Sequence, residues 1–164
     1  MTSLDRLWAP WRSGFVTRRQ SGRCFLCTAV QSRADHQHRV IAREAQAFAL
    51  LNLYPYNNGH VMVAPRRHVG RLEAIRPSEW LAILRLSQRL MSRMRRLIHP
   101  HSFNLGFNEG RDAGAGVPGH LHLHVVPRWR GDTNFMPVLS NAKVVSQSLD
   151  ELYTLLTASQ RTKR

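Results

Sequence analysis

Residues 119–128 constrain the fold most strongly, because three of the nine histidines alternate there with apolar residues in the order Gly-His-Leu-His-Leu-His-Val-Val-Pro-Arg. Side chains two positions apart share one face of a β-strand. The alternation therefore predicts a strand with its histidines on one face and its leucines in a core. These histidines are His120, His122 and His124. Burying three imidazoles for packing alone costs too much desolvation, so we expect this strand to carry function.

The length of 164 residues suits one domain that can bury a sizeable core. We expect a cytoplasmic protein with no membrane partner, because no apolar run reaches the ~20 residues of a membrane helix and the N-terminus is polar and contains proline. Lysine and arginine number 24 against 10 acidic residues. This excess favours anionic partners such as nucleotides or nucleic acid, although an arginine-rich solvated surface would give the same count.

The only two cysteines, Cys24 and Cys27, are two residues apart. This spacing suits shared ligation of one metal ion or a redox pair better than a structural disulfide, because so short a loop closes little chain entropy. The sequence around them lacks the βαβ pattern of a redox motif. A structural zinc ion needs four sulfur and nitrogen ligands, so distant histidines would complete the set. If all three histidines of residues 119–128 bound the metal, the site would instead resemble a catalytic zinc.

Apolar periodicity predicts an α+β fold with an antiparallel sheet of about five strands, one long helix and one short C-terminal helix. The strands are expected at residues 40–41, 47–52, 60–65, 103–108 and 120–128. The long helix begins at Pro77 and ends before Pro100. A capping box at 148–151 opens the short helix. The long helix carries four arginines that we expect to lie in solvent: Arg85, Arg89, Arg93 and Arg96.

A glycine-rich loop at residues 109–119 leads into the histidine segment. Glycines allow backbone N–H groups to approach and cradle a phosphate, and we expect Gly114 and Gly116 to contact the substrate in this way. A neutral imidazole beside such a cradle can attack phosphorus and form a phosphoramidate. A second imidazole can hold a phosphate oxygen or protonate the leaving group. The segment therefore predicts transfer of a phosphorus-containing group.

The pattern His-φ-His-φ-His-φ-φ at residues 120–126 resembles the defining motif of the histidine triad (HIT) superfamily of nucleotide hydrolases and transferases. Residues 51–68 and 108–110 are similar to the family's upstream strand-turn-strand and phosphate-loop opening. Together these segments cover most of residues 24–130. Within the superfamily, the chain looks most like bacterial diadenosine tetraphosphate phosphorylase-like proteins. That similarity lies in residues 8–12, 52–57 and 126–135.

The resemblance implies that His122 is the nucleophile that takes up the nucleotidyl group, and that His124 binds the α-phosphate and assists proton transfer. Asn52 matches a ribose-binding position and Asn108 a phosphate-loop asparagine. His60 matches a histidine that supports the triad, and we place it with the substrate-binding residues. The resemblance further implies a structural zinc ion, with no organic cofactor. Its four ligands would be Cys24, Cys27, His68 and His120.

The resemblance implies cleavage of dinucleoside polyphosphates through a covalent nucleotidyl-histidine intermediate, with phosphate as the expected acceptor, in a homodimer whose two sheets join. Many hydrolase members place a glutamine four residues before the first triad histidine. In this chain Gly116 occupies that position, in a loop one residue longer than in those members. The missing glutamine mildly favours phosphate over water as the acceptor. Two alternatives stay open: a HIT-type hydrolase of nucleoside phosphoramidates or nucleotidyl conjugates, and a non-catalytic, zinc-stabilised nucleic-acid-binding module. We expect an N-terminal arm at 1–23, the HIT domain at 24–158 and a basic tail at 159–164.

Overall fold

The computed structural model describes residues 24–132 and 147–158. The expected arm at 1–23 and the basic tail at 159–164 lie outside these described residues, as does the segment 133–135 that follows the histidine strand. Within the described ranges, none of the helices has the length and apolar character needed to cross a membrane.

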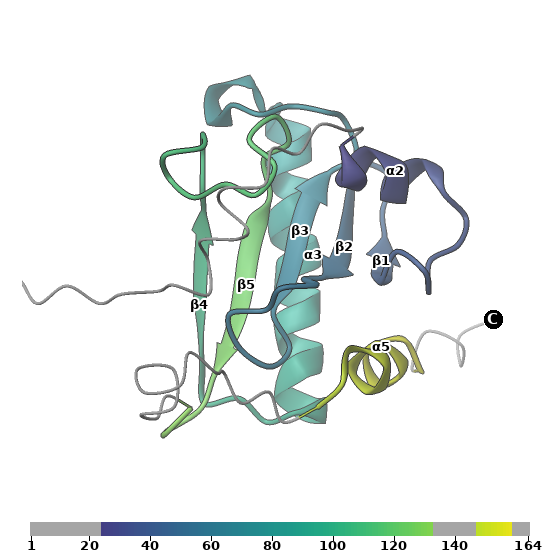
Figure 1. Ribbon diagram of the computed structural model, residues 1–164, viewed down its shortest axis with the longest axis vertical. Coiled ribbons are helices and arrows are strands. Elements are labelled where there is room, and N and C mark those ends of the chain that lie inside the picture. Colours follow the sequence, from purple (N-terminus) through teal and green to yellow (C-terminus); the bar gives the residue numbers. More distant parts are fainter. Residues whose placement is uncertain (1–23, 133–146, 159–164) are drawn as a thin grey trace, which may run out of the picture.

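Five strands form one antiparallel sheet, which confirms the expected α+β architecture. They are β1 Val40–Arg43, β2 Ala47–Leu51, β3 Val61–Pro65, β4 Ser102–Phe107 and β5 Leu123–Arg128. Their order across the sheet is β1-β2-β3-β5-β4, so the last strand in the sequence lies between β3 and β4 (Figure 1). Every expected strand is present, although the boundaries differ by a few residues.

Both expected helices are also present, the long one with the predicted proline at its first position and the short one with the predicted capping box. Helix α3 spans Pro77–Leu97, and the Glu79 carboxylate accepts a hydrogen bond from the backbone N–H of Arg76 at 2.9 Å. Helix α5 spans Leu149–Ala158. Before it, the Glu151 carboxylate accepts from the Ser148 N–H at 2.9 Å, while the Ser148 hydroxyl accepts from the Glu151 N–H at 3.2 Å. This reciprocal pair is the predicted capping box.

Two short helical elements in the described part of the chain were not predicted: helix α2, Phe25–Gln31, and a 3-10 turn, Leu72–Ala74. Helix α2 has seven residues, too few for a period of 3.6 to be visible in the sequence. Its buried residues, Leu26 and Ala29, pack against β2 and β3. A helix this short is marginal alone and forms through such tertiary packing.

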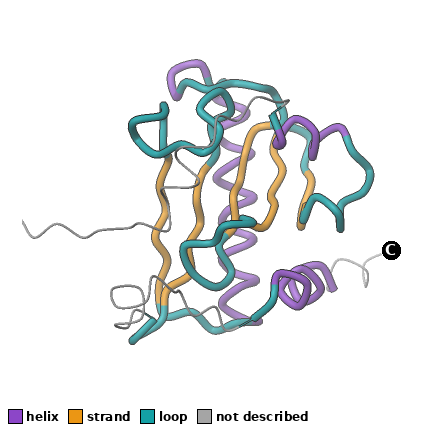
Figure 2. The backbone as a smooth tube through the Cα atoms, viewed as in Figure 1, coloured by secondary structure: helices purple, strands orange, loops and turns teal. Residues whose placement is uncertain are grey.

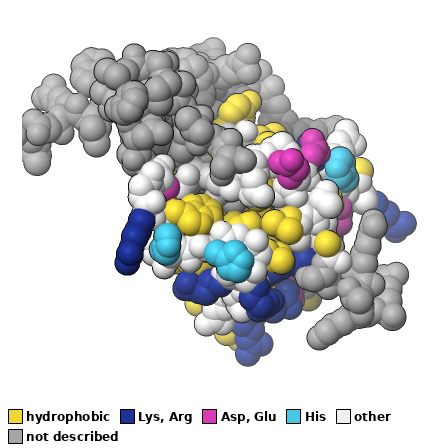
Figure 3. Space-filling model, turned by 90° about the horizontal axis from the view of Figure 1, so that it is seen from below, with side chains coloured by type: hydrophobic (Ala, Val, Ile, Leu, Met, Phe, Trp, Pro, Cys, Tyr) yellow, Lys and Arg dark blue, Asp and Glu magenta, His cyan; other side chains and the backbone are white. Residues whose placement is uncertain are grey.

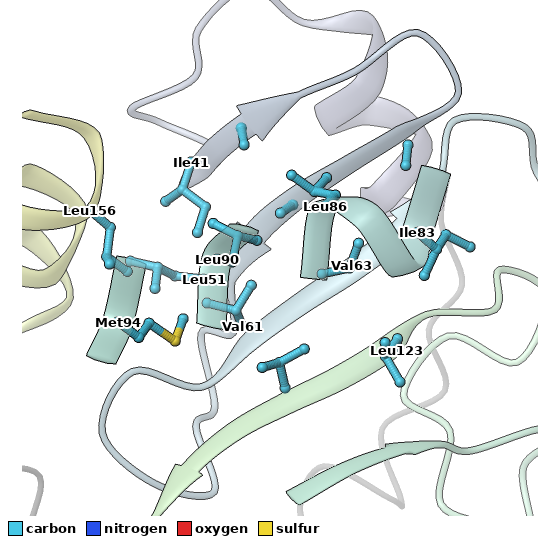
Figure 4. Close-up of a cluster of buried hydrophobic side chains, with 14 of the residues drawn as sticks. Ile41, Leu51, Val61, Val63, Ile83, Leu86, Leu90, Met94, Leu123 and Leu156 are labelled. Atoms are coloured by element: carbon cyan, nitrogen blue, oxygen red, sulfur yellow. The ribbon is translucent and has the colours of Figure 1, made fainter. Parts of the chain in front are cut away.

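Both faces of the sheet are buried, so the hydrophobic core has two separate parts. Alternate residues of β2, β3 and β5 point to one face, where α3 and α5 cover them (Figures 2 and 4). The main cluster on this face includes Leu51, Val61, Val63, Ile83, Leu86, Leu90, Met94, Leu123 and Leu156. On the other face, α2 packs against Phe48, Leu50 and Met62. Helix α2 occupies the β1–β2 side (Figure 1), so the histidines lie on the part of this face formed by β3 and β5.

The expected strand at 120–128 begins only at Leu123, so the prediction that all three histidines stand on one strand was wrong. The N–H of His120 donates to the Val117 carbonyl at 3.1 Å, which closes a turn. The N–H of Leu121 donates to the Val69 carbonyl at 2.7 Å. The backbone before Leu123 is therefore bonded to loops, and only His124 lies on β5.

Candidate functional site

Four buried histidines gather on the sheet face opposite α3: His60, His120, His122 and His124, with exposed fractions of 1%, 0%, 3% and 8%. His124 lies on β5, paired in register with Met62 of β3 and Gly106 of β4. His60 directly precedes β3, and Asn52 directly follows β2. The sheet thus brings the end of β2, the start of β3 and the start of β5 together.

A chain of hydrogen bonds sets the tautomers of His60 and His124. The backbone N–H of Tyr56 donates to His60 Nδ1 at 3.0 Å, and the Asn52 amide lies 3.3 Å from the same atom. Because Nδ1 of His60 accepts, its proton is on Nε2, which is 2.9 Å from Nδ1 of His124. His60 therefore donates to His124 Nδ1, and the proton of neutral His124 is on Nε2. The arrangement makes His124 Nε2 a proton donor.

A separate contact sets the tautomer of His122. Its Nδ1 lies 2.9 Å from the backbone carbonyl of His120, and a carbonyl can only accept. The Nδ1 atom of His122 thus carries the proton, and Nε2 keeps its lone pair. Burial lowers the pKa of His122, an effect that the bond to the His120 carbonyl partly offsets. The neutral ring, which a nitrogen nucleophile needs, is therefore favoured.

The two imidazoles are neighbours with complementary roles. The ring centroids of His122 and His124 are 4.8 Å apart, with nearly perpendicular planes. The tilted ring of Tyr56 lies over His60 and His124, with centroid distances of 4.6 Å and 5.5 Å. A lone pair and an N–H donor side by side can attack an electrophile and protonate its leaving group. This geometry fits the roles expected of His122 and His124.

The other residues expected to contact substrate are Asn52, Asn108, Gly114 and Gly116. Phe107 pairs with Leu123, so the next residue, Asn108, follows on toward His122. Asn52 also closes its own turn, because its side-chain oxygen Oδ1 accepts a hydrogen bond from the Tyr54 N–H at 2.9 Å. In the glycine-rich loop, the N–H of Gly114 donates to the Arg111 carbonyl at 2.9 Å. Phosphate binding by Gly114 would have to replace that bond, and the contacts of Gly114 and Gly116 with substrate stay predictions.

The remaining triad histidine, His120, points away from this pair and into a cluster of sulfur and nitrogen atoms. The ligand atoms of Cys24, Cys27, His68 and His120 all lie within 4.8 Å of one another. His120 Nδ1 is 3.4 Å from Cys24 Sγ and 3.5 Å from Cys27 Sγ, and His68 Nδ1 is 3.2 Å from Cys27 Sγ. Ideal tetrahedral zinc would place sulfur and nitrogen ligands about 3.6 Å apart, from bonds of about 2.3 and 2.05 Å.

The surroundings of this cluster also fit a metal. His120 Nε2 donates to the Pro65 carbonyl at 2.9 Å, which leaves the Nδ1 lone pair directed at the cysteines. Burial and the neighbouring Cys24 raise the pKa of the Cys27 thiol to about 11, so a cation would have to displace its proton. A Cβ at Gly119 would lie 3.1 Å from His68 Nε2, a contact that glycine avoids. Because His120 faces the cysteines, a single zinc held by all three triad histidines does not fit.

The structure also identifies functional groups that the sequence analysis missed. These are the Tyr56 N–H, the Pro65 carbonyl and the His120 carbonyl, each of which sets the tautomer of a histidine ring. All three are backbone groups, so no side-chain pattern marks them. By contrast, the structure brings the four candidate metal ligands together in one cluster and places His122 beside His124.

The fold and the site define an α+β protein with a buried imidazole pair beside a Cys2His2 cluster. Residues 33–131 match the HIT domain, and the chain belongs to the HIT domain family. The AP-4-A phosphorylase of Mycobacterium tuberculosis (strain ATCC 25618 / H37Rv) is 37% identical over 161 residues, covering 93% of this chain and 83% of that protein.

Two further relatives support the family and the fold. The asymmetrical bis(5'-nucleosyl)-tetraphosphatase of Schizosaccharomyces pombe is 34% identical over 94 residues, covering 57% of this chain and 51% of that protein. The crystal structure of a Zn-bound histidine triad family protein from Mycobacterium smegmatis superposes with a TM-score of 0.67 at 27% identity. That alignment covers 85% of this chain and 94% of the other.

Proposed function

We propose that this protein is an enzyme that cleaves dinucleoside polyphosphates such as diadenosine tetraphosphate, by way of a nucleotidyl group bound covalently to His122. The observation that carries the proposal is the tautomer of His122, whose Nδ1 proton is held by the His120 carbonyl so that Nε2 keeps a lone pair. The named relatives, a phosphorylase and a tetraphosphatase of such nucleotides, support this substrate class.

In the first step, His122 Nε2 attacks the α-phosphorus of one adenosine. A P–N bond forms, the P–O bond to the bridging oxygen breaks, and ATP leaves with the proton of His124 Nε2. In the second step, a phosphate oxygen attacks the same phosphorus while His124 takes up its proton. The P–N bond breaks, ADP is released, and both imidazoles return to their starting tautomers. Diadenosine tetraphosphate and phosphate thus become ADP and ATP.

Phosphate is the acceptor we propose, because Gly116 replaces the glutamine that many hydrolase members carry there. Asn52 and Asn108 would hold the ribose and the phosphates. Around the pair, the low dielectric of a buried site strengthens imidazole and backbone donors. Both steps depend on the position of the two imidazoles and on proton transfer by His124.

Product analysis tests the proposal. The protein is incubated with diadenosine tetraphosphate with and without phosphate, and nucleotides are separated by ion-exchange chromatography. We expect ADP and ATP only when phosphate is present, and a nucleotidylated protein in an alkaline quench by intact mass. His122→Ala should abolish both signals, whereas His99→Ala, an exposed histidine outside the site, should leave them unchanged. AMP and ATP as products would assign water as the acceptor, and an active His122→Ala protein would refute the mechanism.

We infer that Cys24, Cys27, His68 and His120 hold a structural zinc ion. The donor set and its distances support this, as does the Zn-bound relative. A bound zinc would neutralise the thiolates and tie α2 to the loops before α3 and β5. Cys24 and Cys27 form no disulfide with each other, which suits the reducing cytoplasm that we propose as the location of the protein.

We also propose a homodimer in which two sheets join through β4. This strand lies at the edge of the sheet, and Leu105 on it is 49% exposed. An edge strand offers unpaired N–H and C=O groups to a second copy. Light scattering after size-exclusion chromatography should give twice the monomer mass. Leu105→Lys should lower it toward the monomer, whereas Leu53→Lys, a control at an exposed leucine in the β2–β3 loop, should not.

A further inference from the structure

Helix α3 carries five of the 24 basic residues of the chain, and the proposed function uses none of them. The sequence predicts that four of its five arginines, Arg85, Arg89, Arg93 and Arg96, lie on a solvated face, and Arg85, Arg89 and Arg96 are indeed exposed. Arg93 contradicts that prediction, because it is only 8% exposed. Its turn of α3 packs close to α5, where Arg93 Nη2 is 3.5 Å from the Leu155 carbonyl. A buried arginine needs a partner for its charge.

Arg93 lines a groove of about 680 Å³ between α3 and the end of β1. Four arginines line the groove together with a single carboxylate, and several arginine side chains lie close together in the view from below (Figure 3). These groups are Arg43, Arg89, Arg93, Arg96 and Glu44. The groove is on the α3 side of the sheet, away from His122 and His124 on the opposite face.

Two of the four arginines have carboxylate partners. Arg43 donates from Nε and Nη2 to Asp35, and also to the carbonyls of Ala29, Val30 and Ser32. Arg89 forms an ion pair with Glu44. Arg43 and Arg89 therefore neither need nor readily accept another anion.

Arg93 and Arg96 have no such partner among the described residues. Nε of Arg93 is buried without a hydrogen bond there, and Arg96 donates only to the Ser92 hydroxyl, at 3.0 Å. Burial, and then the charge of Arg96, lower the pKa of Arg93. A guanidinium nevertheless stays charged in proteins. Two adjacent cations thus line the groove, and one of them has a buried N–H donor that is unused.

We propose that this groove binds the phosphate groups of a small polyanion, the size of inorganic triphosphate, through Arg93 and Arg96. Guanidinium groups bind phosphate oxygens in a planar, bidentate geometry, and a buried fork is already positioned for it. A phosphate oxygen would accept from Arg93 Nε–H and offset the repulsion between the two arginines. The groove floor rests on Leu86 and Leu90, which belong to the core, so the ligand would be held at a rigid surface.

The side-chain Nε–H signals of ¹⁵N-labelled arginine test this site separately from the histidines. The full chain is titrated with inorganic triphosphate, with ATP, and with a single-stranded RNA oligonucleotide, at constant ionic strength. The Arg93 signal is assigned by its loss in Arg93→Met. If that protein does not fold, the signal is assigned by the change in its chemical shift in Arg96→Gln, because Arg96 is its neighbour. We expect a saturable shift of the Arg93 signal with triphosphate. Equal affinity for ATP would assign recognition to the phosphate chain, and tighter binding of ATP would assign it to a nucleotide.

Arg96→Gln should weaken triphosphate binding roughly tenfold or more, the effect of losing one charged hydrogen bond. The matched control is Arg85→Gln, which removes the same charge from α3 outside the groove and should leave the affinity unchanged. Turnover of diadenosine tetraphosphate should stay the same in both variants, so this proposal and the proposed function can fail independently. An unmoved Arg93 signal, the same shift with sodium chloride, a shift with RNA alone, or equal effects of the two variants would overturn it.

Discussion

His60 offers the sharpest test of how the site is organised, because it is placed to act on the reaction through another residue. It accepts from the Tyr56 N–H and donates to His124 Nδ1 at 2.9 Å. His60→Leu removes the hydrogen-bond donor and introduces an apolar side chain of similar size. His60→Gln keeps an N–H at a position close to Nε2. Comparing the two separates loss of the hydrogen bond from loss of the imidazole.

The expected size of the effect follows from the burial of this contact. His60 and His124 are 1% and 8% exposed, so His124 Nδ1 would lose its donor away from bulk solvent. A buried acceptor left without its donor costs about 1–3 kcal/mol. If that cost appears in the transition state, it lowers kcat by about 5- to 150-fold. The value of KM should change little, because His60 lies behind His124.

Steady-state rates of diadenosine tetraphosphate consumption, measured with saturating phosphate, give kcat and KM for each variant. We expect kcat to fall by that factor in His60→Leu. In His60→Gln, most of the lost kcat should be restored. Urea unfolding of both variants corrects for any loss of folded protein. Equal kcat values for His60→Leu, His60→Gln and the unchanged protein would refute the proposed action of His60 through His124. A rise in KM with an unchanged kcat would assign His60 to ground-state binding instead.

Three further predictions concern stability. Cys27→Ser should remove bound zinc in a metal assay and lower the unfolding midpoint, as a chelator should in the unchanged protein; a midpoint insensitive to chelation would contradict a structural metal. Asp132 accepts from Arg128, from the Trp129 N–H and from Asn57, and mainly Arg128 holds the pKa of Asp132 below its usual range. Its stabilisation is therefore complete above the unfolded pKa of about 3.9 and is lost as the pH falls through the lower folded value. Asp132→Asn should lower the free energy of unfolding by about 1 kcal/mol at pH 7. In urea unfolding at a series of acidic pH values, the variant should lose less stability than the unchanged protein, and an equal loss would contradict this. Leu86→Ala, at a residue 1% exposed, should cost about 2–5 kcal/mol in the same assay, and a loss below that range would place Leu86 outside the close-packed core.

Periodic patterns and caps predict most of the fold, because they report local preferences that tertiary packing reinforces. Pro77, the capping box at Ser148 and the alternating strands all have side-chain signals of this kind. Helix α2 has no such signal, since its seven residues are stabilised by contact with the sheet. The burial of Arg93 was missed for a similar reason, because it depends on where α5 packs.

The sequence indicates which side chains of the candidate site lie close together, but it does not indicate how their rings are oriented. The spacing of the cysteines and histidines, together with the family resemblance, indicated which residues belong together. Alternation alone placed His120, His122 and His124 on one strand, whereas the turn at His120 directs its ring toward the cysteines. Backbone carbonyls and N–H groups decide the tautomers, and such groups are the same in every residue.

The position of β5 between β3 and β4 has a consequence for how the protein matures on the ribosome. Strands β1, β2 and β3 pair with neighbours in the sequence, so they and α3 can associate once about the first hundred residues are exposed. Among the described residues, strand β4 pairs only with β5, so none of them offers it a partner in this sheet until residue 128 has been synthesised. The same event brings His124 to His60. Completion of the sheet and assembly of the site are therefore one late step, and a nascent chain stalled before β5 contains a largely formed scaffold without its proposed chemistry.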